Sequence, residues 1–375
     1  MLRIASTSTM SLLGFLYMAC FLGCSYGDGS EPTNRNYPPL TPVYQYPADS
    51  SANVSTTPSL KWEGTSFNYR YDIYLDSINP PTKQISLAQG HNWVNVSTLQ
   101  YNSVYYWKVV ATDGINPPVS GPVWCFTTRQ PTYGSYPGEV RSFPLGSTGL
   151  TIEMCWCPPG SFQMGTPVRG VSTDKLESPV HTVTIAEGFW LSKYEVTQGQ
   201  WTAVMSYNLS AFRDRSNSKL LPVEMVQYNE VQMFEVNTGG DYFLPSEAQW
   251  EYACRAGTST LFYCGDTLSS GSIGSFIRSN SNSNGVTHPV GEKIANAWNL
   301  HDMSGNVWEW CEDLYHDNYN GAPCDGSPWV TDAQNSNHII RGGSWMHNLD
   351  ACRSAFRFAK YSGKYYIGFR LCRQP

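Results

Sequence analysis

The stretch Asn299-Leu-His-Asp-Met-Ser-Gly-Asn-Val-Trp-Glu-Trp-Cys311 decides how the second half of the chain folds. It places the turn-forming residues Asn, Asp, Ser and Gly directly before two tryptophans, and it has no long amphipathic period. The same density of Gly, Trp and short polar turns extends over residues 149–372. We therefore expect loops and short strands, with helices only at 197–205 and 246–255. Ser246, followed three residues later by Gln249, is typical of a capping box.

Composition limits the possible classes of protein. The chain has 375 residues, 24 Lys+Arg against 30 Asp+Glu, and a formal net charge of −6. Charged residues make up 14% and aromatic residues another 14%, a combination that argues against disorder. No basic run is present, so nucleic acid is not an expected partner. The length favours two domains, at roughly 100–200 residues each.

The first residues are typical of an export signal. Arg3 precedes an apolar stretch at 10–24 that is shorter than the roughly 20 residues of a membrane span. Leu22-Gly-Cys-Ser25 resembles a bacterial lipobox, which predicts a signal peptide at 1–23, lipidation of Cys24 and a polar tether at 24–39. The expected location is outside the cytoplasm on a membrane anchor, at the outer membrane, the cell surface or in the periplasm. An ordinary secretory signal is the alternative.

Residues 40–128 alternate apolar and polar positions in short runs separated by turn residues, which predicts an all-β sandwich. Trp62 and the run Tyr106-Trp107-Lys-Val resemble the strand motifs of a fibronectin type III module. No group of catalytic residue types occurs here, which favours a spacer or a weak binding module. The Pro- and Gly-containing residues 129–143 then form a linker.

Six motifs within residues 144–375 resemble the sulfatase-modifying factor family, which includes the formylglycine-generating enzyme. They are Phe162-Gln-Met-Gly165, Glu177-Ser-Pro-Val-His-Thr-Val183, Phe189-Trp-Leu-Ser-Lys-Tyr-Glu-Val-Thr197, Leu244-Pro-Ser-Glu-Ala-Gln-Trp-Glu-Tyr-Ala-Cys-Arg-Ala-Gly257, the stretch 299–311, and Arg341-Gly-Gly-Ser-Trp345 with Ile367-Gly-Phe-Arg-Leu371. The resemblance implies an α+β, loop-rich variant of the C-type lectin fold.

The resemblance does not settle whether the chain is an enzyme. Oxidase members hold Cu(I) with two cysteines at the third and eighth residues after the serine of the Gly-Gly-Ser motif, because soft thiolates suit a soft ion. Counting from Ser344 gives His347 and Cys352, so one cysteine is replaced. We therefore expect a non-catalytic domain. The alternative is a divergent sulfatase-activating oxidase in which Cys352, His347 and Ser344 form a copper site.

Two further features are implied by the resemblance. A calcium site corresponds to the carboxylates of Asp302 and Glu309 with the carbonyls of Gly305 and Val307, an oxygen set that suits this hard ion. A disulfide corresponds to Cys254 and Cys372. Without Cys20 and Cys24, nine cysteines remain, an odd number that leaves at least one unpaired, and Cys352 is the leading candidate.

The C-terminal segment supports a competing function in binding. Related lectin-like proteins use this segment to contact ligands, and aromatic residues bury area at low entropic cost. The candidate contact residues are Trp345, Met346, His347, Asn348, Phe356, Phe358 and Tyr361, although Trp345 is also a candidate core residue. HExxH, Walker A and GxSxG motifs are absent from the sequence. The expected function is thus binding of a peptide, protein or glycan at the cell surface.

Overall fold

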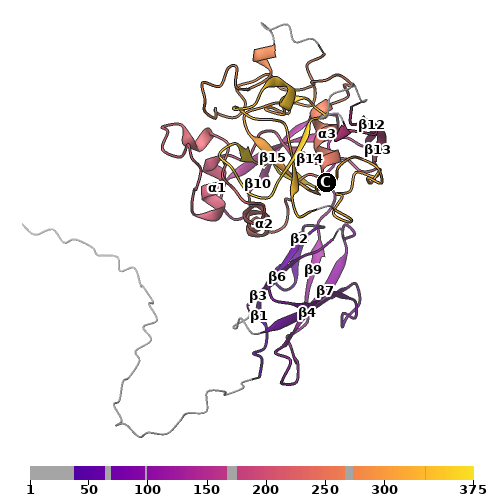
Figure 1. Ribbon diagram of the computed structural model, residues 1–375. Helices are drawn as coiled ribbons and strands as arrows, with labels where there is room; N and C mark the ends of the chain where they lie inside the picture. Colours follow the sequence, from indigo (N-terminus) through magenta and orange to yellow (C-terminus); the bar gives the residue numbers. More distant parts are fainter. Residues whose placement is uncertain (1–37, 64–68, 98, 167–174, 267–272, 334) are drawn as a thin grey trace, which may run out of the picture. The chain divides into compact units, whose positions relative to one another are not determined.

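The computed structural model describes residues 38–63, 69–97, 99–166, 175–266, 273–333 and 335–375 (Figure 1). The expected signal peptide, Cys24 and most of the tether lie outside these residues. Among the described residues, no helix combines the length and the apolar character needed to cross a bilayer.

The N-terminal part of the described chain consists of two β-sheets that share one core. One sheet has the order β1-β3-β6 and the other β2-β9-β7-β4-β5, with β8 beside β7. The strands are β1 Val43–Tyr46, β2 Ser51–Val54, β3 Ser59–Glu63, β4 Arg70–Asp76, β5 Gln84–Gln89, β6 Trp93–Asn95, β7 Val104–Thr112, β8 Val119–Ser120 and β9 Trp124–Thr128. Buried positions alternate along β4 and β7, as expected for strands with one face on a core. The all-β prediction is confirmed, whereas the assignment to the fibronectin family stays a prediction.

The chain segment after β9 connects to the second domain through a buried arginine. Arg129 donates one hydrogen bond to Asp241 (2.6 Å) and another to the carbonyl of Gln374 (2.8 Å). Close to it, Tyr46 donates to the carbonyl of Gly239. A Cβ on Gly239 would lie 2.1 Å from the Tyr46 hydroxyl, so glycine permits this close approach.

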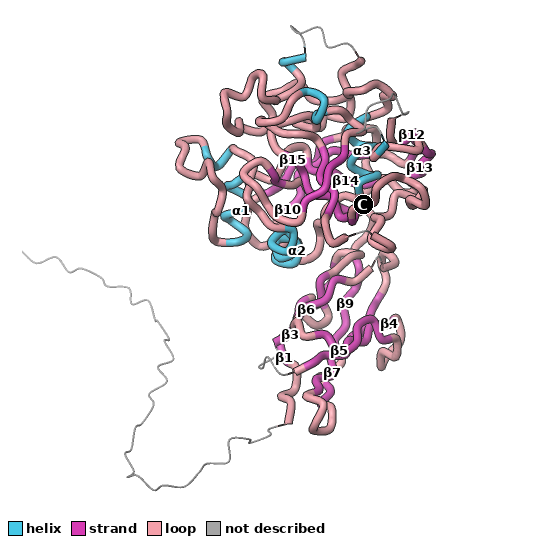
Figure 2. The backbone as a smooth tube through the Cα atoms, viewed as in Figure 1, coloured by secondary structure: helices cyan, strands magenta, loops and turns pink. Residues whose placement is uncertain are grey.

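The second domain contains short strands in three sheets, with few helices (Figure 2). The sheet orders are β10-β11-β14-β19, β12-β13 and β17-β16-β15-β18. The strands are β10 Val140–Pro144, β11 Thr151–Cys157, β12 Gly160–Met164, β13 His181–Ile185, β14 Phe189–Ser192, β15 Trp308–Leu314, β16 His338–Arg341, β17 Arg357–Lys360, β18 Ile367–Gly368 and β19 Cys372–Arg373. The helices are α1 Gln198–Met205, α2 Tyr228–Asn237 and α3 Glu247–Arg255, with 3₁₀ turns η2 Ser218–Leu220, η3 Ile273–Ser275 and η4 Leu349–Cys352. The α+β, loop-rich prediction is confirmed.

Strand β11 separates two aromatic-rich cores by its two-residue period. Ile152, Met154 and Trp156 pack with residues of α1 and α2 in one cluster. Cys155 and Cys157 pack with residues of α3 in the other. Because successive side chains on a strand point to opposite faces, one strand serves both cores.

Both predicted helices are present, and local capping explains their positions. Thr197 and Ser246 cap α1 and α3, and in each case a glutamine three residues later completes a capping box. Helix α2 was not predicted. Its N-cap is Gln227, which is not one of the usual capping residues, although Glu230 accepts a hydrogen bond from the Gln227 amide.

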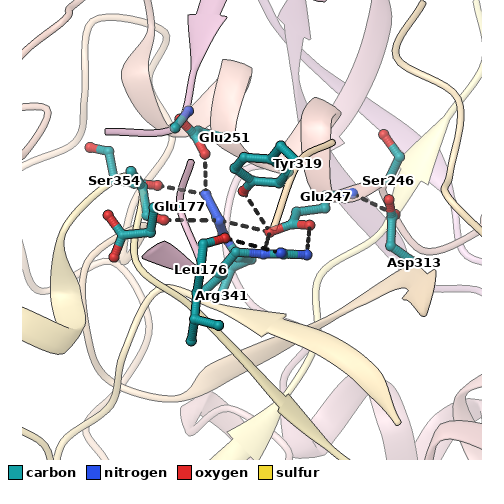
Figure 3. A network of polar contacts seen from close by, with 12 residues as sticks. Leu176, Glu177, Ser246, Glu247, Glu251, Asp313, Tyr319, Arg341 and Ser354 are labelled. Carbon is teal, nitrogen blue, oxygen red and sulfur yellow. Dashed lines mark hydrogen bonds and ion pairs between the residues drawn. The ribbon is translucent and has the colours of Figure 1, made fainter. Parts of the chain in front are cut away.

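A buried network of charged side chains connects α3 to the C-terminal sheet (Figure 3). Arg341 donates to Glu247 (3.0 Å) and to Glu251 (2.5 Å), while Arg357 pairs with Glu247 (2.7 Å). Tyr319 also donates to Glu247. Arg341 is completely buried, so its positive charge is stabilised by these carboxylates and not by water.

Candidate functional site

The loop after β16 begins with two glycines that allow it to turn tightly. Gly342 and Gly343 have φ values of +95° and +76°, which favour glycine. A Cβ on Gly343 would also lie 2.6 Å from Sγ of Cys352. The next residue, Ser344, is fully buried, and its carbonyl accepts a hydrogen bond from the His347 amide. The Gly-Gly-Ser motif thereby fixes the position of the His347 backbone, from which the imidazole projects.

The imidazole of His347 is held by two donors at the same nitrogen. The indole N–H of Trp308 lies 3.2 Å from Nδ1, and the hydroxyl of Ser344 lies 2.7 Å from the same atom. A tryptophan indole can only donate, so Nδ1 must be the unprotonated acceptor. The proton of the neutral ring is therefore on Nε2. Burial, and after it the charge of Lys360, lowers the pKa of His347, so the ring is neutral at pH 7.

Aromatic rings lie around His347, and several of them are partly exposed. We call His347, Phe356, Phe358, Tyr365 and Tyr366 the aromatic face. Trp308 lies beneath it, with its ring centroid 5.5 Å from His347, 5.9 Å from Phe356 and 6.4 Å from Phe358. Tyr366 contacts His347 at 5.2 Å and Tyr365 at 5.3 Å.

The predicted contact residues differ in how far they reach solvent. Phe358 is 44% and Tyr361 74% exposed, whereas Trp345 is only 9% exposed and packs between Phe212 and Tyr365. Met346 and Phe356 are half-buried. Asn348 is exposed, but its side chain accepts the Ala351 amide and caps η4. Trp345 is therefore mainly a core residue, and Phe358 and Tyr361 are available to a ligand.

Sequence reasoning did not assign Trp308 and Lys360 to this site. Lys360 places its ammonium 4.8 Å from the ring centroid of Phe358, next to the aromatic face. Trp308 is separated from His347 by 39 residues, and its contact depends on β15 and the loop after β16. The Asn-Val-Trp-Glu-Trp motif contained the tryptophan, but nothing in the sequence indicated which way its ring points.

Cys352 lies in different surroundings from His347. It is fully buried in an apolar cluster with Phe262, Ile273 and Ile277, and its thiol faces the carbonyl of Asn348 at 3.7 Å. Burial raises the pKa of the Cys352 thiol to about 12. A Cu(I) site needs a thiolate, and Nδ1 of His347 already accepts two hydrogen bonds. Copper binding at the two family positions would therefore require loss of the Cys352 thiol proton, and Nδ1 of His347 would have to give up its hydrogen bonds to become a ligand.

The expected calcium loop is held by an arginine. The Glu309 carboxylate pairs with both Nε and Nη2 of Arg370 (2.6 and 2.7 Å) and also accepts from the Trp250 indole (2.6 Å). Asp302 accepts from the Gly291 amide. No group of three or more His, Cys, Asp or Glu side chains within the described ranges has the geometry of a metal site. Glu309 in this arrangement does not fit the role of a calcium ligand, because Arg370 already occupies its oxygens.

Two buried carboxyls near this loop, those of Asp302 and Glu195, have no paired arginine among the described residues of the kind that Glu309 has. Burial raises the pKa of Asp302 to about 6. Burial, followed by repulsion from Asp302 and Glu309, raises the pKa of Glu195, which accepts from the Asn306 side chain and the Val307 amide. Gly305 contributes a backbone amide bonded to the Gly342 carbonyl. The loop thus connects the expected calcium segment to the Gly-Gly-Ser turn.

The cysteines that the structure describes are free thiols. Cys254 faces the carbonyl of Met303 (3.7 Å), and Cys372 faces the side-chain oxygen of Gln249 (4.0 Å). The expected Cys254–Cys372 disulfide is therefore not formed in this structure. Burial raises the pKa of both thiols, to about 12 for Cys254, which keeps them protonated.

Sequence comparisons identify relatives of the second domain. Pkn1, a serine/threonine-protein kinase of Chlamydia caviae, is 37% identical over 63% of this chain and 40% of its own length. The formylglycine-generating enzyme of Mycobacterium tuberculosis is 32% identical over 35% of this chain and 51% of its own. A chaperone protein, LppX of Paenibacillus barcinonensis, is 24% identical over 56% of this chain and 85% of its own. The chain thus spans about two fifths of the length of the kinase relatives.

Solved structures show the same fold. PvdO from Pseudomonas aeruginosa has a TM-score of 0.57 and 32% identity, covering 64% of this chain and all of that one. Variable protein 1 of Treponema denticola has a TM-score of 0.52 and 24% identity, with 63% of this chain and 99% of that one covered. Residues 145–375 match the sulfatase-modifying factor enzyme 1-like domain. The chain belongs to this family.

Proposed function

We propose that this protein is an exported, lipid-anchored protein whose family domain binds a peptide or glycan ligand at the aromatic face. The observation that carries this proposal is the neutral His347 ring with its proton on Nε2, set among partly exposed aromatic residues. This nitrogen is a hydrogen-bond donor, and Lys360 adds a positive charge beside Phe358. A ligand for this surface presents an oxygen acceptor together with an apolar or ring face.

The environment of Cys352 favours binding over copper oxidation. A buried thiol with a raised pKa is a poor ligand and a poor nucleophile, since the thiolate is the reactive form. Ser344 is completely buried and donates to His347, so its role is to position the imidazole. The relative named as a chaperone supports a binding function for a domain of this kind. The alternative remains a divergent oxidase that uses Cys352.

The proposal is tested by screening the purified protein on glycan and peptide arrays, followed by titration of the ligands found. His347→Phe keeps an aromatic ring but removes the donor, and Phe358→Ala removes exposed ring area. Each is expected to weaken binding about tenfold or more, because a lost hydrogen bond or buried ring costs on the order of 1–2 kcal/mol. Cys352→Ser is the matched control and should leave affinity unchanged.

The oxidase alternative is tested on the same protein. Cu(I) is titrated, and oxygen uptake is followed with a Cys-Thr-Pro-x-Arg peptide as substrate. We expect no tight copper binding and no turnover. Tight binding with turnover that Cys352→Ser abolishes would reject the binding proposal in favour of the oxidase.

A further inference from the structure

A second candidate site shares no residue with the aromatic face and is a cavity of about 590 Å³ where the two domains meet. Thr57, Ser59 and residues 95–97 of the N-terminal β-rich part line one side. Glu235 at the end of α2, residues 242–244 and Glu312 in β15 line the other. A volume of this size suits a small ligand, and such sites are common between domains.

The charges that line the cavity all have one sign. Its charged residues are Glu187, Glu235, Glu312 and Asp325, and no Lys, Arg or His is among the lining residues. Asp325 is satisfied locally, because it accepts from the amide and the hydroxyl of Ser327. Glu187 is exposed at the rim. Glu235 and Glu312 are therefore the carboxyls that determine what the interior of the cavity can bind.

Glu235 is 95% buried, as its exposed fraction is 5%. Its Oε1 accepts the Leu244 amide at 2.7 Å. Its other oxygen accepts no hydrogen bond from the described residues and is not one of their enclosed polar atoms, which agrees with the position of this side chain in the cavity wall. Burial, followed by the nearby Glu312 carboxyl, raises the pKa of Glu235. An unpartnered oxygen next to a second carboxyl is an environment that a bound cation would stabilise.

The remaining walls indicate what kind of cation would fit. Val96, Tyr242 and Leu244 are buried, and Phe243 is half-buried beside them. A bare metal ion would gain nothing from these apolar groups, and it would need more oxygen ligands than one unpartnered carboxylate oxygen offers. A guanidinium or ammonium group on a short apolar chain matches both the paired carboxyls and the apolar walls.

We propose that this cavity binds a small organic cation, an ammonium or guanidinium group carried on an aliphatic chain, through Glu235 and Glu312. The group is either part of a free amine or the side chain of a peptide arginine or lysine. The site is independent of the aromatic face, because the residues that line the cavity include none of its members.

The experiment is calorimetric titration of the protein, both domains included, with agmatine, with acetyl-Gly-Arg-Gly-amide and with uncharged butylurea. We expect saturable binding of agmatine and none of butylurea. Binding of the arginine peptide as well identifies a side chain as the ligand, and binding of agmatine alone identifies a free amine. Absence of saturable binding by both cations would overturn the proposal.

Three variants test the residues. Glu235→Gln keeps an oxygen for the Leu244 amide but removes the charge, and with Glu312→Gln it is expected to weaken binding at least about tenfold. Ser97→Arg leaves both carboxyls intact and places a tethered guanidinium at the cavity, so it should block binding in a protein that still folds. Glu153→Gln alters a carboxylate that pairs with Lys193 outside the cavity and should have no effect. Undiminished binding in both Glu235→Gln and Ser97→Arg would refute the site.

Discussion

The indole N–H of Trp308 donates a hydrogen bond to Nδ1 of His347 over 3.2 Å, and this contact determines which ring nitrogen carries the proton. The Ser344 hydroxyl reinforces the same tautomer from 2.7 Å. The family resemblance implies a cysteine of the oxidase members at the position of His347. If that correspondence holds, the imidazole presents a hydrogen-bond donor where those members have a thiol.

The tautomer can be observed directly by nitrogen NMR of the imidazole. At pH 7 we expect His347 to be neutral and protonated on Nε2, because burial and Lys360 lower its pKa. Trp308→Phe keeps ring packing but removes the donor, and should allow both tautomers. A ring that is charged at pH 7, or protonated on Nδ1 in the unmodified protein, would contradict the geometry.

The buried charge network predicts a large loss of stability from one substitution. Arg341→Ala removes the cation that Glu247 and Glu251 share, so that these two buried carboxylates retain only Arg357 and Arg255 as counter-charges, which should lower the free energy of unfolding by about 3–5 kcal/mol. Chemical denaturation measures this loss. Glu153→Ala, at a pair with Lys193 that is partly exposed, is the control and should change it by less than about 1 kcal/mol.

Glu224 predicts a dependence of stability on pH. Burial raises its pKa to about 7, and its Oε2 has no hydrogen-bond partner among the described residues. The folded state then holds a proton that the unfolded state releases above roughly pH 4.3. Stability from this group is therefore greatest at low pH and is lost as pH rises toward 7.

This dependence can be isolated with Glu224→Gln, whose side chain does not titrate. The melting temperature of the variant should vary less between pH 4.5 and 7 than that of the unmodified protein. Identical pH profiles for the two proteins would show that Glu224 is ionised in the folded state throughout this range.

Arg370 pairs with the Glu309 carboxylate, and this pairing predicts the response to a chelator. The melting temperature should be the same in EDTA and in millimolar calcium. Arg370→Met should lower it sharply, since it leaves the Glu309 carboxylate buried without its counter-charge. Stabilisation by calcium would instead support the expectation from the family resemblance.

Lipid anchoring is tested at Cys24. Because two acyl chains hold a protein on a membrane where one chain does not, Cys24→Ser should move the protein from the membrane fraction to the soluble fraction. Cys20→Ser is the matched control and should leave it in the membrane fraction. An unchanged distribution of the Cys24→Ser protein would argue against lipidation.

Local signals predicted the fold better than they predicted the site. Capping at Thr197 and Ser246 acts within three residues, so α1 and α3 were accessible from sequence. Helix α2 begins at Tyr228 after the less typical N-cap Gln227, and it was missed. Counting from Ser344 located His347, but its tautomer depends on Trp308, which only the folded sheet brings near.

The same limit applies to the cysteines. The position of Cys352 was predicted by counting along the motif, whereas its burial in an apolar cluster arises from packing against Phe262 and Ile277. Likewise, an arginine on Glu309 could not be inferred, since Arg370 lies 61 residues away in sequence.

The long spacing of the buried ion pairs has a consequence for biosynthesis. The arginines that pair with Glu247, Arg341 and Arg357, are synthesised 94 and 110 residues after it. The partner of Glu177, Arg353, is synthesised 176 residues after it. At roughly 5–20 residues per second, a ribosome needs on the order of ten seconds to supply the missing arginines. During that interval Glu177 and Glu247 lack these partners, so their carboxylates must stay hydrated and cannot be buried. The domain can therefore close only after nearly all of its chain has been made.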